Sequence, residues 1–347
     1  MRLIDCDVHN VVGPIATLEP YLDAHWREVI ATSQFAGPTD QAHPPNLATS
    51  ARTDLPPADG GAPGRSVAAT RAQLLDRLDV GLAILSCDYG VESVRNPDAA
   101  VALARAVNAW QASEWLDREP RLRAALVVPS QHPVAAVAEI EHWAGDPRFV
   151  AVYLPVRSAM PYGNRIWWPL WEAIVRHELV AELHFGGSAG VPPTAAGWPT
   201  TWLEEYVDMA SAFAAQLTSL VAEGTFDRFG GLRLSLIESG FAWLPAFLWR
   251  FDKGWRGLRR EVPWTTRLPS EYVRDHVRVS LQPVDGPPEP AELLRVIDQL
   301  GSEQMLMFSS DYPHRHVTED LAAVPDGLPR AVADGLLAGN AREHYRL

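Results

Sequence analysis

Eight short apolar segments recur along the chain, with helical patterns between them. This alternation is typical of parallel strands that are joined by crossover helices. Most of the segments are nearly continuous apolar runs flanked by Gly, Pro or Asp, as expected for strands that are buried on both faces. We predict strands at 2–9, 81–87, 123–129, 149–155, 179–185, 232–239, 277–282 and 304–311.

The segments between these strands carry helical periodicity. We predict helices at 66–79, 98–118, 133–144, 167–177, 201–222, 243–253, 290–300 and 328–339. Eight strands with helices between them indicate the α/β class and a (β/α)8 TIM barrel. The predicted elements occupy nearly all of the 347 residues. We therefore expect one barrel domain over 1–347, although length alone would allow about two domains.

Residues 35–65 break the alternation, because they are rich in Pro, Gly, Ala, Asp and Thr and show little periodicity. We predict a long loop inserted after the first strand. One interpretation is a surface excursion. The other is a lid or an arm of a dimer, since long loops inside compact domains are often functional.

The charge balance is acidic, with 30 Lys and Arg against 43 Asp and Glu and a net charge of −13. Such a field repels nucleic acids and anionic membrane surfaces, so we expect a small-molecule substrate. Cys6 and Cys87 lie in apolar runs without a second Cys or His at zinc-finger spacing, which disfavours a disulfide framework. With no apolar run of membrane-spanning length and no signal-peptide pattern, we expect a cytoplasmic protein.

Polar side chains interrupt the first predicted strand. Because side chains alternate along a strand, Asp5, Asp7 and His9 are predicted to share the face inside the barrel. The same alternation predicts that Ile4 and Cys6 face the helices. Three titratable groups would then line up inside the barrel.

Three further polar residues stand at predicted strand ends: His184, Glu238 and Asp311. Active sites of such barrels lie at the carboxyl edge of the strands. Taken singly, each residue also has a structural interpretation, as a hydrogen-bonded core histidine or a turn residue. Together, several titratable groups in one barrel mouth would be costly to desolvate without a cation. We therefore predict a divalent metal site.

The predicted ligands are Asp7, His9, His184 and Asp311. Two imidazoles and two carboxylates suit Zn²⁺, Mn²⁺ or Fe²⁺ and leave room for water or substrate. The spacing alone does not select the metal. We take zinc as the first expectation, with manganese and iron as alternatives.

These residues lie in motifs that resemble a known family. The run IDCDVH at 4–9, His184, SDYPH at 310–314 and GNA at 339–341 resemble the amidohydrolase superfamily. The similar branch includes aminocarboxymuconate semialdehyde decarboxylase and γ-resorcylate decarboxylase. The resemblance implies a distorted barrel that holds one metal, with Asp7 in place of the first histidine of the family's His-x-His. It also suggests a homodimer.

The sequence departs from that family in two places. Residues 149–155 contain no lysine that could bridge two metals, which favours a mononuclear site. Glu238 stands where the family's decarboxylases keep a histidine. Ionised Asp7, Asp311 and Glu238 outweigh one divalent cation, so the site would repel a carboxylate substrate unless Glu238 is protonated or paired with an arginine. Arg157 and Arg315 are candidate partners or ordinary loop arginines.

Hydrolysis suits this acidic site more readily, with Asp311 activating a metal-bound water and Glu238 moving a proton to the leaving group. Glu238 could instead brace a ligand. We predict a mononuclear metal-dependent hydrolase of a small aromatic or cyclic substrate. The first alternative is a non-oxidative decarboxylase of an aromatic or unsaturated acid, in which Asp311 protonates the ring carbon. The second is a catalytically silent barrel that acts as a binding subunit.

Three residues are candidate substrate contacts: Arg157, Trp243 and His314. Trp243 follows Glu238 by about one helical turn and could wall an aromatic pocket, although tryptophans at helical spacing usually pack in the core. His314 lies on the loop after the last strand, where histidines are often solvated.

Overall fold

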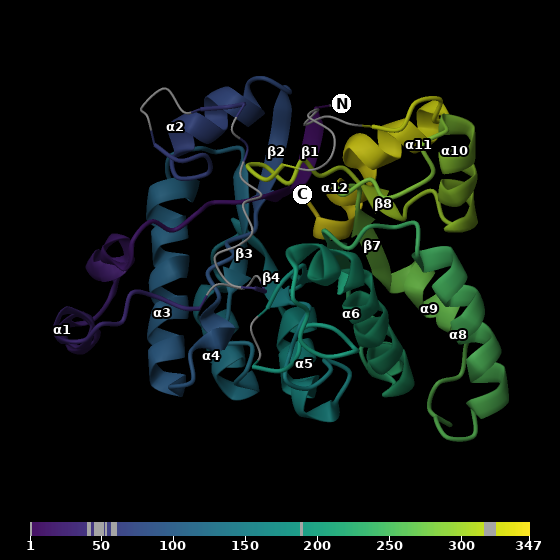
Figure 1. The fold of residues 1–347 in the computed structure, drawn as a ribbon, viewed down its shortest axis with the longest axis horizontal. Helices are drawn as coiled ribbons and strands as arrows, with labels where there is room; N and C mark the ends of the chain where they lie inside the picture. The colour runs from purple at the N-terminus through teal and green to yellow at the C-terminus, as the bar shows by residue number, and fades with distance from the viewer. Residues whose placement is uncertain are drawn as a thin grey trace.

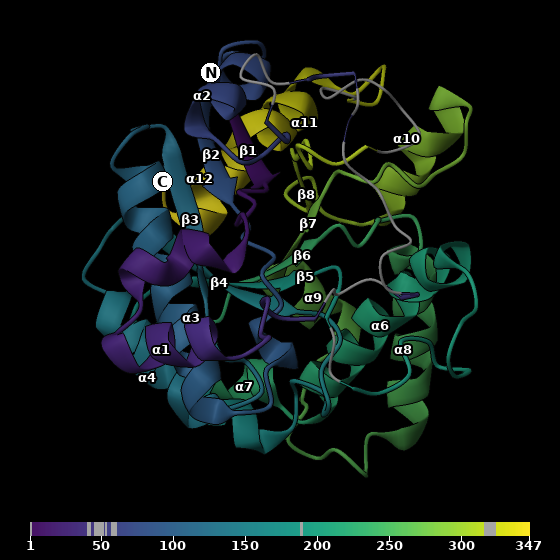
Figure 2. The same ribbon diagram turned by 60° about the vertical axis from the view of Figure 1, so that its left-hand side comes forward.

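The computed structural model describes residues 2–39, 43–44, 52, 54–56, 61–187, 190–315 and 324–347. Eight parallel strands pair in chain order, each with the next. The helices lie outside these strands (Figure 1, Figure 2). The predicted (β/α)8 barrel is confirmed. The strands are β1 (Leu3–Val8), β2 (Val80–Leu85), β3 (Leu122–Val127), β4 (Phe149–Pro155), β5 (Val180–His184), β6 (Leu234–Ile237), β7 (Val277–Ser280) and β8 (Leu306–Met307).

The helices of the barrel match the predicted segments, and four further helices, α1, α7, α9 and α12, occupy segments that the sequence left unassigned. No residue of α1 is buried, so a weak apolar pattern is expected there. The α-helices are α1 (Ala24–Thr32), α2 (Val67–Thr70), α3 (Pro97–Trp110), α4 (Pro133–Trp143), α5 (Trp168–Arg176), α6 (Trp202–Ala222), α7 (Thr225–Arg228), α8 (Leu244–Leu258), α9 (Pro269–His276), α10 (Pro290–Gln299), α11 (Arg330–Asp334) and α12 (Asn340–Tyr345).

The barrel closes between β1 and the segment that follows β8. The Cys6 amide donates to the Phe308 carbonyl at 3.0 Å, and the His9 amide donates to the Tyr312 carbonyl at 2.7 Å. The predicted last strand, 304–311, is longer than β8, because the chain leaves the regular ladder after Met307. Asp311 therefore lies on a loop at the carboxyl edge.

The prediction that Ile4 and Cys6 face the helices is wrong. Both pack in the cluster inside the barrel, together with buried residues of β2, β3, β4 and β5. The pairing of β1 with β2 shifts register between Asp5 and Val8, and such an irregularity changes which side chains point inward. Asp7 still reaches the interior. Asp5 instead accepts the backbone N–H groups of Asp7 and of the β8 loop.

The described residues of the insert contact the carboxyl edge of the barrel. The Arg52 amide donates to the Pro313 carbonyl at 2.8 Å, and the His43 amide donates to the Glu205 carboxylate on α6. The rest of 35–65 lies largely outside the described residues, so its role as a lid or a dimer arm stays a prediction. None of the described helices is long and apolar enough to cross a membrane.

The C-terminal helix α12 contacts the barrel interior through Tyr345. Its hydroxyl donates to Glu182 Oε1 at 2.7 Å and lies 2.9 Å from Ser235 Oγ. Glu182 and Ser235 are fully buried. Burial raises the pKa of Glu182 to about 8, and the hydrogen bond from Tyr345 opposes that rise. The end of the chain therefore satisfies polar groups of two central strands.

We expect Tyr345→Phe to lower the free energy of unfolding by roughly 1–3 kcal/mol, because Glu182 and Ser235 lose a buried partner. Denaturant unfolding followed by circular dichroism measures the change. The matched control is Tyr89→Phe, which removes a buried hydroxyl that has no hydrogen-bond partner within the described residues. Equal stability losses in the two variants would contradict the prediction.

Candidate metal centre

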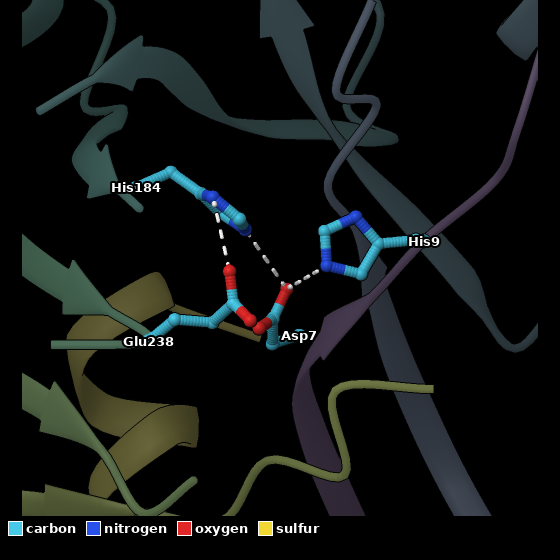
Figure 3. Close-up of side chains that lie close together, drawn as sticks. All are labelled: Asp7, His9, His184 and Glu238. Atoms are coloured by element: carbon cyan, nitrogen blue, oxygen red, sulfur yellow. Dashed lines mark hydrogen bonds and ion pairs between the residues drawn. The ribbon is translucent and has the colours of Figure 1, made fainter. Parts of the chain in front are cut away.

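Four side chains from three strands meet at the carboxyl edge of the barrel. Asp7 and His9 come from the end of β1, His184 is the last residue of β5, and Glu238 directly follows β6. They point toward one another (Figure 3). One ligand atom from each lies within 4.8 Å of the others. The parallel barrel therefore gathers residues that are far apart in the sequence.

The distances within this cluster are short. His9 Nε2 lies 3.5 Å from Asp7 Oδ1 and 2.9 Å from Asp311 Oδ1. His184 Nε2 lies 3.4 Å from the same Asp7 oxygen. Asp7 and Asp311 are fully buried. Of the four predicted ligands, Asp7, His9 and His184 thus belong to one group, and Asp311 adjoins this group through His9.

Glu238 and His314 extend the cluster on the side of β6 and the β8 loop. The Glu238 carboxylate lies 3.6 Å from His184 Nδ1 and 4.0 Å from His314 Nδ1. His314 Nδ1 also lies 2.8 Å from Asp311 Oδ1. A second group that could hold a metal ion combines His9, Glu238, Asp311 and His314. Of the predicted substrate contacts, His314 is the one that joins this cluster.

Two carboxylates of the cluster stand on strained backbone. The φ angle is +57° at Glu238 and +53° at Asp311. A left-handed conformation costs a residue with a side chain roughly 1–3 kcal/mol, and such residues gather at functional sites. The Asp311 amide donates to the Asp7 carbonyl at 3.1 Å, which helps to hold this conformation. The strain therefore marks both residues as candidates for function.

The buried carboxylates of the cluster favour positive charge on the groups around them. Burial opposes the charged form of His184, but the Asp7 carboxylate outweighs it and raises the pKa of His184 to about 9. The pKa of His314 is also raised, because Asp311 outweighs burial. Burial raises the pKa of Glu238 well above its usual range, and the nearby Asp311 and Asp7 add to the rise. This shift favours the protonated form of the carboxyl.

The donor set fits a divalent metal ion. Two buried atoms, Asp7 Oδ2 and His9 Nε2, make no hydrogen bond to any described residue. A cation satisfies such atoms and neutralises adjacent carboxylates. Imidazole and carboxylate donors suit transition-metal ions. The cluster is a divalent metal site.

The structure places Arg157 and Trp243 in other contacts. Arg157 forms a buried ion pair with Glu205 on α6. The Trp243 indole donates to the Ser239 and Gly240 carbonyls at 2.9 and 3.1 Å, closing the turn after β6. Substrate binding by either residue stays a prediction.

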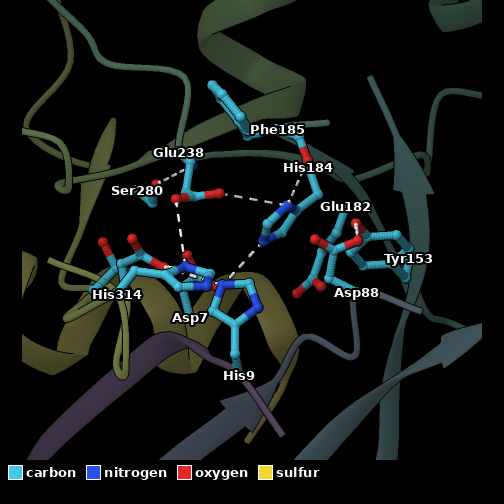
Figure 4. Close-up of polar contacts among 12 residues, drawn as sticks. Asp7, His9, Asp88, Tyr153, Glu182, His184, Phe185, Glu238, Ser280 and His314 are labelled. Carbon is cyan, nitrogen blue, oxygen red and sulfur yellow. Dashed lines mark hydrogen bonds and ion pairs between the residues drawn. The ribbon is translucent and has the colours of Figure 1, made fainter. Parts of the chain in front are cut away.

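Several residues near the centre were not singled out from the sequence. Tyr153 on β4 lies with its ring 5.0 Å from the His184 ring, and its hydroxyl donates to Asp88 Oδ1 at 3.0 Å (Figure 4). Asp88 follows β2, so the strand-end rule could have found it. The aromatic rings of Phe185, Trp202 and Tyr206 form a second group next to His184, with centroids 5.8–6.0 Å apart. No sequence signal marked this group.

The comparisons with known proteins establish the class. The family model described as "Amidohydrolase" matches residues 4–347. The chain therefore belongs to the amidohydrolase family, as the sequence motifs predicted.

Among individual proteins, the chain is similar to a γ-resorcylate decarboxylase of Rhodococcus jostii (strain RHA1). The two sequences are 27% identical over 297 residues, which cover 80% of this chain and 87% of that protein. A structure of 2,6-dihydroxybenzoate decarboxylase complexed with 2,6-dihydroxybenzoate has a TM-score of 0.72 at 19% identity and covers both chains fully. A dihydroxybenzoic acid decarboxylase from Polaromonas sp. JS666, with bound manganese and the inhibitor 2-nitroresorcinol, has a TM-score of 0.68 at 20% identity, over 100% of this chain and 97% of that one.

The prediction of a hydrolase as the main function is wrong, because these relatives are decarboxylases, which was the alternative. The protein is an enzyme of the amidohydrolase superfamily, so the idea of a silent barrel is also set aside. The charge argument counted Glu238 as ionised, but burial raises the pKa of this carboxyl well above its usual range and so weakens the repulsion on which the argument depended. Zinc has no support either, since the Polaromonas neighbour binds manganese.

We expect the purified protein to bind Mn²⁺ and Asp7→Asn to weaken binding by about 100-fold or more. Removing groups that only orient a ligand already costs about 10–100-fold. Titration followed by electron paramagnetic resonance of free Mn²⁺ measures the affinity. The control is His177→Ala, a histidine whose partner at 2.8 Å is Glu141, outside the cluster. Unchanged Mn²⁺ affinity in Asp7→Asn would refute the assignment.

Proposed function

We propose that this protein is a metal-dependent, non-oxidative decarboxylase of a hydroxylated aromatic carboxylic acid. The observation that carries the proposal is a pair of overlapping groups at the carboxyl edge of the barrel, in a chain whose relative over 80% of its length is a γ-resorcylate decarboxylase. One group is Asp7, His9, His184 and Glu238, and the other is His9, Glu238, Asp311 and His314. The barrel positions these side chains, and their imidazole and carboxylate groups would bind the metal ion and move the proton.

Asp7, His9, His184 and Asp311 would hold the metal ion, and the Polaromonas neighbour has bound manganese. When bound, this ion supplies positive charge that holds and orients an anionic oxygen of the substrate. Burial raises the pKa of Glu238, and the neutral form that this shift favours would remove one negative charge from the mouth. A substrate carboxylate can then approach a site that has no net excess of negative charge.

The reaction requires one proton. The bond between the ring carbon and the carboxylate carbon breaks, CO2 leaves, and the electron pair of that bond stays with the ring carbon, which takes a proton. Asp311 lies within the cluster and is positioned to deliver this proton. One carboxyl oxygen of Glu238 lies within 4.8 Å of one of Asp311. We assign Glu238 as the group that holds the proton and passes it to Asp311 or directly to the ring.

His314 completes the proton route on the solvent side. Its Nδ1 lies 2.8 Å from Asp311 and 4.0 Å from Glu238. Its side chain is 24% exposed, whereas Asp311 is fully buried. His314 can therefore return a proton from solvent to the buried carboxyls after each turnover.

We expect the Mn²⁺-loaded protein to release CO2 from 2,6-dihydroxybenzoate or another acid in a panel of hydroxybenzoates. In D2O the product should carry one deuterium at the vacated ring carbon, because the proton comes from an exchangeable group. Mass spectrometry of the product measures it, with the same product incubated with Asp311→Asn as the control for spontaneous exchange. A fully Mn²⁺-loaded protein that releases no CO2 from any acid of the panel would contradict the proposal.

We expect Glu238→Gln to lower kcat by about 10²–10⁴-fold, the usual contribution of a general acid, while Mn²⁺ still binds. The amide keeps the size of the side chain but cannot deliver a carboxyl proton. Steady-state kinetics, with Mn²⁺ content measured on the same samples, tests this. The control is Glu223→Gln, which removes a carboxylate that pairs with Arg165 on the surface. A kcat equal to that of the wild type would exclude Glu238 from proton transfer.

A further inference from the structure

The backbone of Glu238 lies just beyond the regular sheet. β6 ends at Ile237, and its pairing with β7 ends at Leu236 and Val279. The Glu238 amide therefore has no strand partner in the ladder. It donates instead to the hydroxyl of Ser280, at 2.9 Å (Figure 4). The Ser280 side chain of the next strand thus takes the place of the missing strand hydrogen bond at Glu238, whose backbone is left-handed.

The orientation of the Ser280 hydroxyl is determined by its surroundings. Ser280 is the last residue of β7 and is fully buried. Its hydroxyl donates to the Gln282 carbonyl at 3.0 Å, so its lone pair is left to accept the Glu238 amide. The Gln282 amide in turn donates to Ser309 Oγ at 2.9 Å. Two buried serine hydroxyls therefore connect the ends of β6, β7 and β8.

The direction of the Glu238 side chain depends on this backbone. With φ at +57°, the carboxylate reaches His184 Nδ1 at 3.6 Å and His314 Nδ1 at 4.0 Å. A relaxed conformation with negative φ would rotate the Cα–Cβ bond and turn the carboxyl away from both histidines. Because glutamate disfavours the left-handed region, some interaction must hold it there.

We propose that Ser280 is a positioning residue, whose hydroxyl holds the Glu238 backbone left-handed and so directs the Glu238 carboxyl into the metal centre. The inference rests on the proposed function only for the part that Glu238 plays in proton delivery. Threonine at 280 keeps a hydroxyl that can accept the Glu238 amide. Alanine leaves that amide without its acceptor.

The test compares Ser280→Ala with Ser280→Thr and with Ser235→Ala. Ser235 is an equally buried serine of β6, but its hydroxyl bonds Tyr345. We expect Ser280→Ala to lower kcat by about 10–100-fold, the cost of removing a group that orients an active-site residue. KM and Mn²⁺ affinity should change by less than about 3-fold, because the four predicted ligands do not depend on Ser280. The kcat values of Ser280→Thr and Ser235→Ala should stay close to that of the wild type.

A double-mutant cycle separates positioning from a general structural effect. If Ser280 acts through Glu238, then Ser280→Ala should cause no further loss of kcat in the Glu238→Gln background. Independent, multiplying losses would overturn the inference, and so would a wild-type kcat in Ser280→Ala. If Glu238→Gln alone leaves kcat unchanged, the proposed role of Glu238 fails instead.

A crystal structure of metal-free Ser280→Ala gives a readout that does not depend on activity. We expect Glu238 to leave the left-handed region and its carboxyl to move away from His184 and His314, while Ser235→Ala keeps the wild-type conformation. A Glu238 that stays left-handed in Ser280→Ala would refute the positioning role. This outcome holds even if no aromatic acid is decarboxylated, so the two proposals fail separately.

Discussion

The close approach of buried carboxyl groups at the barrel mouth is the constraint on which the rest of the site depends. Asp7 and Asp311 are fully buried and lie within 3.5 Å of the same imidazole nitrogen of His9. Water cannot screen these charges, so the protein must supply protonated groups or a cation. The raised pKa values of His184 and Glu238 both reduce the net negative charge of the cluster, because they favour the protonated side chains. A bound divalent ion would balance the buried carboxylates more completely, because it would also give Asp7 Oδ2 an interaction partner.

At the carboxyl edge of the barrel, side-chain hydrogen bonds hold the backbone where the regular strand pairing ends. The Asp5 carboxylate accepts the amides of Asp7 and Ser310 at 3.2 and 3.0 Å, and so joins β1 to the loop after β8. Ser280 joins β7 to Glu238 in the same manner. Side chains with buried acceptors thus replace backbone pairing at the edge of the sheet. These hydrogen bonds help to hold Glu238 and Asp311 in a left-handed backbone conformation. The surrounding fold offsets the free-energy cost of that conformation.

The raised pKa of Glu238 connects this electrostatic arrangement to the charge of the substrates that the site could accept. An ionised carboxylate at 238 would repel an aromatic acid, which is why the sequence favoured hydrolysis. A neutral carboxyl would remove that repulsion and, in the decarboxylation that we propose, would hold the proton that the ring carbon takes. The same burial that makes the site costly to form therefore suits it to an anionic substrate.

The sequence by itself determined the barrel and marked the polar residues at its strand ends, because both follow from local patterns. Apolar runs predicted the strands, and the strand-end rule marked His184, Glu238 and Asp311. Only the tertiary structure decided the inward direction of Cys6, the engagement of Arg157 with Glu205, and the contact of Ser280 with Glu238. These depend on strand register and on packing between segments far apart in the chain. The raised pKa of Glu238 also could not be predicted from the sequence, since a pKa follows from burial and from neighbouring charges.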